Sequence, residues 1–317
     1  MRIVLDLQAC QTDSHKRGIG RYSCALAKAM ARQRGEDELR FALNNIFAAR
    51  AETVREEFSG LVAPGMFSYY QYPRFDKTLD FAHNYQRPVA GALVRNHYAC
   101  LQPDLLHISS VFEGWYAQSA VPGRLSDLPG VIISATLYDI IPLLFPDWYM
   151  PTGPLKHFYH QKYRLLQECD LLLAISEASR KDAINYLGIA PEKIVTIAGA
   201  AEDRFRPLPI SADEAQTLLR RYGLQKPFIL YTGGLDYRKN LTGVISAFAM
   251  LPPEIRQTWQ FAIVCDIDPV NEMILLRHAA KEGLADREIV FTGFVPEDDL
   301  IRLYNLCTLF IFPSLYL

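Results

Sequence analysis

Two glycines followed closely by two cations form the segment of this chain best suited to chemistry. Gly233 and Gly234 come directly after an apolar run at 228–232, and Arg238 and Lys239 stand just before a helical pattern. Glycine lets a ligand approach the end of a strand closely, and the amide groups at a helix start attract anions. Two cations there are unfavourable for the helix unless an anion lies in front of them. The segment therefore predicts a site for a diphosphate.

A solvated helix start without a ligand is the alternative interpretation of the two cations. A Walker-type phosphate loop is excluded, because the chain has no G-x-x-x-x-G-K-S/T run. If the cations meet a diphosphate, each charge-assisted hydrogen bond contributes roughly 1.5–3 kcal/mol. Two such contacts with a departing diphosphate would accelerate its release by on the order of 10²- to 10⁴-fold.

A second pair of glycines, Gly18 and Gly20 on either side of Ile19, opens a helix near the start of the chain. The dinucleotide fingerprint G-x-G-x-x-G requires a third glycine where this chain has Ser23, and a shorter loop after the strand. A dinucleotide-dependent dehydrogenase is therefore disfavoured. The pair either brings a helix N-terminus against a sugar diphosphate or forms a tight loop only.

Three polar side chains lie at the ends of other predicted strands in the first half of the chain. His107 ends the run LLHIS, and Tyr138 and Asp139 follow the run at 131–136. Because open parallel sheets bind ligands at the carboxyl ends of their strands, these residues are candidates for substrate binding, and Asp139 for catalysis. A packed or capping role is more frequent for a single histidine at a strand end such as His107, and local hydrogen bonding is an equally good interpretation of Asp139.

Composition excludes several other classes of protein. A formal net charge of −2 over 317 residues argues against a nucleic-acid binder. The six cysteines are scattered without a C-x-x-C pair or a histidine set, so we expect neither a metal site nor disulfides, and a reducing cytoplasm. Neither a signal peptide nor a membrane span is expected.

Aromatic and basic residues mix at 69–75 and again at 156–164. Stacked aromatic rings suit sugars, and a basic amphipathic helix suits an anionic membrane surface, here the inner face of the membrane. A helix packed by Phe158 and Tyr159 with a solvated opposite face is an equally good interpretation. Peripheral membrane contact therefore stays an expectation.

Short apolar runs alternate with helical patterns, which predicts parallel sheets covered by helices. Strands are predicted at 3–7, 39–43, 105–108, 131–136, 171–175, 194–196, 228–232, 260–265, 288–291 and 309–312, and helices at 20–32, 76–100, 154–168, 177–187 and 213–222. Pro207 and Pro209 interrupt this alternation. We therefore predict an α/β protein with two doubly wound Rossmann-like domains that face a cleft: 1–205, a linker with a connecting helix at 206–226, and 227–317.

Several motifs in order along nearly the whole chain resemble glycosyltransferase family 4. They are RGIGRYS, LYDIIPLLFP, ISEASRKD, GLDYRKNLTGVISAF and TGFVPEDDLIRLYNLCTLFIFPSLY. The resemblance implies a GT-B fold and a retaining, metal-independent enzyme with a nucleotide-sugar donor. The opening MRIVLDLQACQTDSHKRGIGRYS is most similar to bacterial mannosyltransferases that build O-antigen or related polysaccharides, which implies GDP-mannose as the donor.

The resemblance also assigns roles to the residues named above. Arg238 and Lys239 would hold the donor diphosphate and act in catalysis, and Gly18–Gly20 would lie near the diphosphate and the transferred sugar. Asp139 would line the acceptor and sugar side. Gly293, Phe294 and Val295 would border the nucleotide base.

Two departures from the family pattern affect these expectations. Family members often carry histidine where this chain has Tyr138. After FPSLY the family continues into two glutamates that contact the sugar and ribose, whereas this sequence stops at Leu317. The resemblance therefore implies an incomplete second domain and weak or absent transfer by this chain.

We expect transfer of a hexose, mannose by resemblance, from a nucleotide sugar to a glycan or lipid-linked glycan with retention. A non-catalytic nucleotide- or sugar-binding module of the same fold and a nucleotide-sugar epimerase remain the alternatives.

Overall fold

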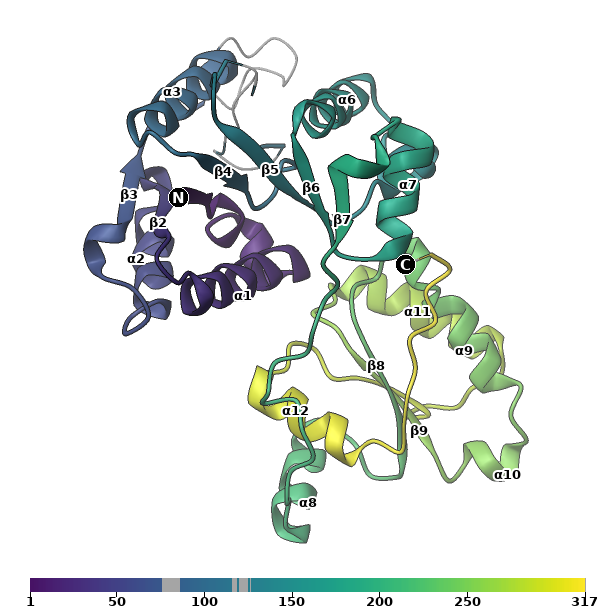
Figure 1. Cartoon of the computed structure of the whole chain (residues 1–317). Helices are drawn as coiled ribbons and strands as arrows, with labels where there is room; N and C mark the ends of the chain where they lie inside the picture. The colour runs from purple at the N-terminus through teal and green to yellow at the C-terminus, as the bar shows by residue number, and fades with distance from the viewer. Residues whose placement is uncertain (76–85, 116–118, 120–124, 126, 317) are drawn as a thin grey trace. The chain divides into compact units, whose positions relative to one another are not determined.

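The structure, a computed structural model, describes residues 1–75, 86–115, 119, 125 and 127–316 (Figure 1). The chain forms two compact units, Met1–Gly199 and Ala200–Leu317, each with its own parallel sheet. The predicted α/β fold with parallel sheets is confirmed. Along the chain, the boundary between the units lies after Gly199, before the predicted boundary at 205. The helix predicted to connect the domains is α8 (Ala212–Arg221), which belongs to the second unit.

In the described part of the first unit, one sheet has the strand order β3-β2-β1-β4-β5-β6-β7. Its strands are β1 (Arg2–Asp6), β2 (Glu38–Asn44), β3 (Phe67–Tyr70), β4 (Leu105–Ile108), β5 (Ile132–Leu137), β6 (Leu171–Ala174) and β7 (Ile194–Thr196). The order reverses between β1 and β4, which makes their carboxyl ends the switch point where such sheets bind ligands.

Helices cover both faces of this sheet. The helices are α1 (Gly18–Gln33), α2 (Ala48–Glu57), α3 (Gln86–Cys100), α4 (Ile141–Leu144), α5 (Pro146–Tyr149), α6 (Gly153–Glu168) and α7 (Glu177–Leu187). Successive residues of β1 face opposite sides: Leu5 packs in one core with α1 and α2, and Val4 in the other with α3, α6 and α7.

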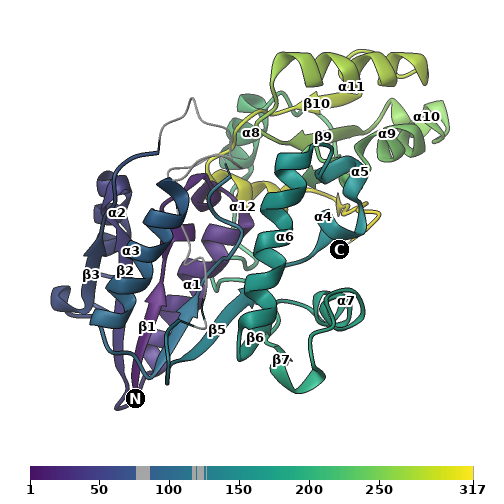
Figure 2. The same cartoon turned by 90° about the horizontal axis from the view of Figure 1, so that it is seen from above.

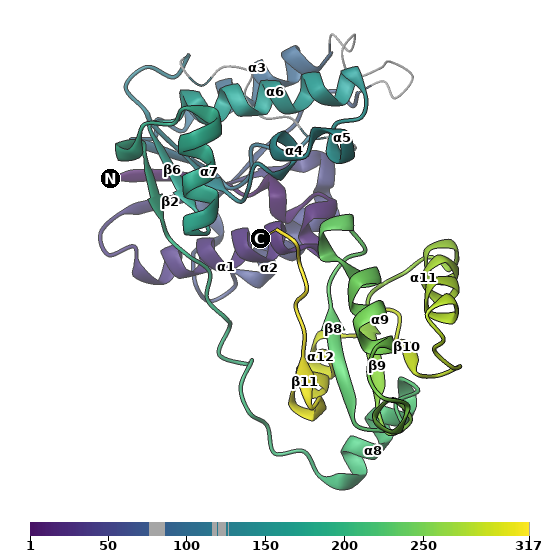
Figure 3. The same cartoon turned by 90° about the vertical axis from the view of Figure 1, so that its right-hand side faces the viewer.

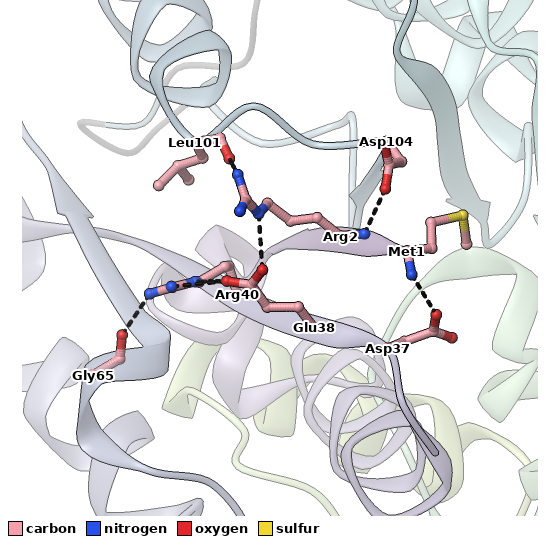
Figure 4. Close-up of polar contacts among 8 residues, drawn as sticks. All are labelled: Met1, Arg2, Asp37, Glu38, Arg40, Gly65, Leu101 and Asp104. Atoms are coloured by element: carbon pink, nitrogen blue, oxygen red, sulfur yellow. Dashed lines mark hydrogen bonds and ion pairs between the residues drawn. The ribbon is translucent and has the colours of Figure 1, made fainter.

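Ion pairs and hydrogen bonds close the amino edge of the first sheet, where the chain begins (Figures 2 and 4). Arg2 Nε donates to Glu38 Oε2 at 3.0 Å, and Arg40 binds the same carboxylate at 2.8 Å. The Arg2 amide donates to Asp104 Oδ2 at 2.6 Å, and the Met1 amino group to Asp37 Oδ1 at 2.9 Å. The charged groups named here therefore all have a partner at this edge.

The described part of the second unit has a sheet in the order β10-β9-β8-β11, again with helices on both faces (Figure 3). Its elements are β8 (Phe228–Thr232), α9 (Leu241–Ala249), α10 (Pro253–Arg256), β9 (Gln260–Val264), α11 (Pro269–Lys281), β10 (Ile289–Phe291), α12 (Glu297–Leu306) and β11 (Leu309–Phe310). Helices α9 and α11 share one core with the sheet, and α8 and α12 share the other.

Short 3₁₀ helices connect several elements. They are η1 (Gln8–Cys10), η2 (Asp13–Lys16), η3 (Asn45–Phe47), η4 (Pro64–Met66), η5 (Pro191–Lys193) and η6 (Tyr237–Lys239).

Among the described strands and α-helices of the first unit, β3, α2 and the short helices α4 and α5 escaped prediction. Strand β3 is short and aromatic, and helix α2 buries only Ala51 and Val54, so its sequence carries almost no apolar period. The helix predicted at 76–100 is described from Gln86, and residues 76–85 lie outside the described part. Acidic residues begin α12, and one of them, Asp299, is buried and ion-paired with Arg221 and Arg302.

Candidate functional site

Three glycines of the second unit, Gly233, Gly234 and Gly293, lie at the carboxyl edge of its sheet. Phe291 of β10 is level with Ile263 of β9, which is level with Tyr231 of β8. Gly293 and Gly233 each follow these positions by two residues. Only β9 separates them, so the two segments lie about 10 Å apart along one edge.

The two glycines after β8 have different physical roles. Gly233 has a φ of +152°, and a Cβ there would lie 2.7 Å from the hydroxyl of Tyr231. That hydroxyl donates to Gly234 O at 2.7 Å, which fixes the turn. A Cβ at Gly234 would meet nothing within 4 Å. Gly233 is required by the backbone, whereas Gly234 leaves room beside the strand end.

Arg238 and Lys239 lie in η6, directly before α9, as the sequence predicted. Asp236 begins this turn and accepts from the Arg238 amide at 3.0 Å, and its carboxylate also lies 3.4 Å from Arg238 Nε. Lys239 Nζ lies 4.6 Å from the centre of the Phe312 ring. Both cations are half-buried. They are oriented by their own unit rather than extended into bulk solvent.

The segment after β11 runs beside this cationic turn. The Leu315 amide donates to Arg238 O at 2.7 Å, and Asn240 Nδ2 donates to Pro313 O at 3.5 Å. Arg238 Nη1 lies 3.5 Å from Tyr316 O. The turn between β8 and α9 is therefore held from two sides, by Asp236 and by the segment at 312–316.

The residues predicted to border the nucleotide base divide between surface and core. Phe294 is 72% exposed beside Gly293, whose φ is +68°. Val295 packs in the core with α8 and α12, so its side chain cannot contact a base in this position. Of the three, Phe294 alone presents a ring that a flat ligand could stack on.

The glycine turn of the first unit is tightly packed. A Cβ at Gly20 would lie 2.4 Å from His15 Cα and 2.6 Å from Ser14 O, so η2 and α1 can approach only with glycine there. A Cβ at Gly18 would meet nothing within 4 Å. The tight-loop interpretation therefore accounts for Gly20 but not for Gly18.

Tyr138 holds the first turn of α1 in place. Its hydroxyl lies 2.7 Å from Ser23 Oγ and donates to Ile19 O at 3.0 Å. Ser179 Oγ in turn donates to the Tyr138 carbonyl at 2.6 Å. Tyr138 is 7% exposed. Tyr138 was predicted to bind substrate, and the structure places its hydroxyl against the first turn of α1, where it supports the glycine turn.

Asp139 and His107 have local partners. Asp139 Oδ1 accepts from the Ile141 amide at 3.0 Å, and the side chain is half-buried. His107 is buried, with ring nitrogens 2.9 Å from Ser134 Oγ and 3.1 Å from Thr136 Oγ1. Burial lowers the pKa of His107 to about 4. His107 is a neutral, packed histidine, which was the alternative to a substrate-binding role.

The loop between β1 and α1 is anchored by buried polar residues that the sequence did not single out. Asp6 Oδ1 accepts from the Gln8 amide at 3.0 Å. Glu113 accepts from Thr12 Oγ1 at 2.6 Å and from Ser14 Oγ at 2.9 Å. Burial raises the pKa of Asp6 to about 7. A charged residue at the end of an apolar strand was the available signal for Asp6, and nothing comparable marked Glu113.

Most of the aromatic residues proposed for sugar stacking lie in the core instead. Tyr70, Tyr72 and Phe75 are buried with α3, and only Tyr69 is exposed. On α6, Phe158 is buried and Lys156 is exposed, as the packed-helix interpretation requires. Lys162 departs from that pattern, because it is buried.

Two other kinds of site are absent from the described residues. Within the described residues, no three histidine, cysteine, aspartate or glutamate side chains are grouped so that they could hold a metal ion. No helix in the described part of the chain has the length and apolar character needed to cross a membrane.

Comparison with known families and proteins agrees with these features. A model described as Glycosyltransferase Family 4 matches residues 16–201, more than half of the chain, and one described as Glycosyl transferases group 1 matches residues 219–316. The serotype-specific mannosyltransferase WbdA of Escherichia coli is 30% identical over 320 residues, which cover 100% of this chain and 38% of that protein. The chain thus spans little more than a third of this relative.

Two more distant similarities complete the comparison. The O-antigen chain mannosyltransferase B of Escherichia coli is 26% identical over 300 residues, which cover 94% of this chain and 73% of that protein. The crystal structure of Anabaena Alr3699/HepE in complex with UDP and glucose has a TM-score of 0.64 at 17% identity, covering 99% of this chain and 74% of that one. The latter similarity concerns the GT-B fold alone.

Proposed function

Because the chain belongs to glycosyltransferase family 4, as its motifs predicted, we propose that it takes part in transfer of a hexose from a nucleotide sugar to a glycan or lipid-linked glycan. GDP-mannose is the proposed donor. The names of two relatives, a serotype-specific mannosyltransferase and an O-antigen chain mannosyltransferase, support mannose as the sugar.

One observation carries this proposal: the ordered pair of cations at the carboxyl edge of the second sheet. Asp236 orients Arg238, the segment at 312–316 flanks the turn, and Gly234 leaves open space beside it. A diphosphate bound there would neutralise two half-buried positive charges in a partly desolvated position, where charge-assisted hydrogen bonds are strong. Phe294 would then stack against the base, with Gly293 allowing close approach.

The proposed reaction needs no nucleophile from the protein. An acceptor hydroxyl attacks the anomeric carbon from the face that the diphosphate leaves, which retains the configuration. The bond from the anomeric carbon to the diphosphate oxygen breaks, the new glycosidic bond forms, and the hydroxyl proton passes to the departing diphosphate. Arg238 and Lys239 stabilise the negative charge on the leaving group.

The first unit supplies the remaining proposed contacts. The amide groups at the start of α1, in the Gly18–Gly20 turn, would face the diphosphate and the transferred sugar. Asp139 would lie on the acceptor side, and Tyr138 acts through the position of the turn. We place the reaction in the cytoplasm, with contact to the inner face of the membrane where the acceptor is lipid-linked.

A thermal-shift panel tests this function. The unfolding midpoint would be measured with GDP, UDP, ADP, GDP-mannose, UDP-glucose and free mannose. We expect a selective rise with GDP and GDP-mannose, because a ligand that binds only the folded state stabilises it. Equal midpoints with all the nucleotides would contradict the proposal. Release of free GDP from GDP-mannose in the presence of acceptor separates transfer from epimerisation, and tight binding without release would identify a binding module.

A further inference from the structure

Helix α11 of the second unit exposes several large apolar side chains. Leu275 and Ala279 are its buried residues. Four other apolar residues of the helix are 44–61% exposed: Val270, Met273, Ile274 and Leu276. Single apolar residues scattered over a surface are normal, whereas a contiguous exposed apolar patch marks an interaction site. The positions of these four residues around the helix decide which case applies.

The exposed apolar residues lie together on the outer side of α11. Successive residues of an α-helix are about 100° apart around the axis, so the four fall within one arc of about 160°, opposite Leu275. Arg277, Ala280 and Lys281 lie in the same arc and are also exposed. We call these seven residues the outer face of α11.

The outer face of α11 carries two cations and no acidic residue. Within the described residues, neither the Arg277 nor the Lys281 side chain makes a hydrogen bond or an ion pair. Glu272, the acidic residue of the helix itself, lies about 60° from Leu275, on the side of the sheet. Glu282 follows the helix and accepts from Ser246 Oγ of α9 at 3.2 Å. The exposed arc therefore combines apolar side chains with uncompensated positive charge.

The place of α11 in the sheet explains why this face is open. The helix connects β9 to β10, which is the edge strand of the described sheet. On its inner side it shares a core with α9 (Figure 3), and His278 Nε2 lies 3.0 Å from Ser246 Oγ of that helix. Packing against α9 and the sheet thus uses one side of α11 and leaves the outer face to solvent or a partner.

We propose that the outer face of α11 binds an anionic lipid surface. The apolar side chains enter the boundary between headgroups and acyl chains, and Arg277 and Lys281 meet the lipid phosphates. The inference deepens the proposed function and rests on it for one point, the lipid-linked acceptor that such a surface would carry.

Charge argues for lipid over a second copy of the chain. In a two-fold symmetric dimer the same face meets itself. Arg277 and Lys281 would then be buried against their own copies, and burying unpaired like charges is costly. An anionic membrane surface instead supplies the opposite charge and leaves the cations partly hydrated.

Helix α6, which the sequence offered as the basic amphipathic element, meets the requirement less well. Its residues Phe158, Tyr163, Leu165 and Leu166 are buried. The apolar side of α6 therefore faces the core of the first unit, whereas α11 turns apolar residues outward.

Co-sedimentation of the whole chain with vesicles tests the proposal. The vesicles consist of phosphatidylcholine alone or with about 30% phosphatidylglycerol, without any acceptor. We expect binding to the anionic vesicles that weakens as the salt concentration rises. Arg277→Gln, Lys281→Gln should weaken it by on the order of tenfold or more, because both contacts to lipid phosphates are lost. Val270→Gln, Ile274→Gln should weaken it by a similar factor, because apolar side chains no longer enter the bilayer.

Matched controls come from exposed residues elsewhere in the chain. Arg220→Gln, Lys226→Gln removes two exposed cations of the same unit, and Tyr186→Gln removes an apolar side chain that is 61% exposed on α7. Both controls should bind the anionic vesicles as the wild type does. All these variants should keep the wild-type unfolding midpoint, since substitutions of exposed residues change stability little.

Equal binding to the two kinds of vesicle, no binding to either, or unchanged binding in either α11 double variant would overturn the proposal. Analytical ultracentrifugation covers the other occupant: self-association that Val270→Gln, Ile274→Gln abolishes would assign the face to a second copy of the chain. GDP affinity, measured without vesicles, should be the same in the wild type and in both α11 variants. Vesicle binding without GDP binding would contradict the donor site alone, so the two failures are distinguishable.

Discussion

The glycine segments of the two units occupy similar positions in the chain, but the space around their glycines differs. Each follows a strand of a parallel sheet and leads into a helix, β1 into α1 and β8 into α9. In the first unit, η2 packs so closely against Gly20 that a Cβ there would lie 2.6 Å from Ser14 O. The Tyr138 hydroxyl also holds this turn by donating to Ile19 O. In the second unit, Gly234 faces open space next to two cations.

The difference separates packing from ligand binding. A glycine whose Cβ would collide with backbone is explained by the fold, and its replacement should destabilise the protein. A glycine with empty space around it leaves room for a ligand, and its loss should spare the fold. Gly18 and Gly234 are of the second kind, which makes them matched probes for the glycine turns of the two units.

The largest expected effect comes from the cations of the second unit. Arg238→Ala, Lys239→Ala should slow release of nucleoside diphosphate from the donor by on the order of 10²- to 10⁴-fold, because two charge-assisted contacts to the leaving group are lost. Steady-state rates for the wild type and the double variant measure this. Lys226→Ala is the control, since Lys226 is exposed and donates to Gln257 O far from the turn in sequence. Equal rates for all three proteins would show that this segment does not bind the diphosphate of the donor.

Next in size is the effect of a methyl group at Gly20. Gly20→Ala should lower the free energy of unfolding by about 1–3 kcal/mol or more, because the new Cβ overlaps the backbone of η2. Gly18→Ala should change it by less than about 0.5 kcal/mol. Urea unfolding of both variants gives the comparison. Similar stabilities would mean that η2 is not packed against α1 as described.

The anchoring of the first loop should depend on pH. The pKa of Asp6 is raised to about 7, so the folded state holds a proton that the unfolded state releases near pH 4. Stability from this group is complete below pH 4 and is lost as the pH rises through 7. Asp6→Asn keeps the acceptor for the Gln8 amide and should be more stable than the wild type at pH 8, by roughly 1–4 kcal/mol. Parallel stability profiles from pH 4 to 8 would contradict this.

The smallest effect belongs to Tyr138→Phe. The variant loses hydrogen bonds to Ile19 O and Ser23 Oγ, which should cost about 1–2 kcal/mol of stability. If Tyr138 only positions the glycine turn, the loss in donor affinity should be modest and should match that of Ser23→Ala. A much larger loss in Tyr138→Phe than in Ser23→Ala would show that the hydroxyl contacts substrate directly.

Sequence patterns predicted those parts of the molecule that local physics determines. Strands such as β4 and β8 and helix α7 follow from apolar period and turn residues, and their predicted bounds agree with the structure. The buried contacts of Tyr138 and His107 could not be predicted, because they depend on residues far away in sequence: Ile19 and Ser23 for Tyr138, and Ser134 and Thr136 for His107. Periodicity places a residue on a face of a helix or strand, but it does not identify the partners across the core.

The most direct test is an isothermal titration of GDP into the wild type, into Arg238→Ala, Lys239→Ala, and into Gly234→Ala. The account predicts saturable binding by the wild type, at least tenfold weaker binding by the double variant, and weaker binding by Gly234→Ala with an unchanged unfolding midpoint. Wild-type affinity in both variants would show that the glycines and cations after β8 do not receive a diphosphate.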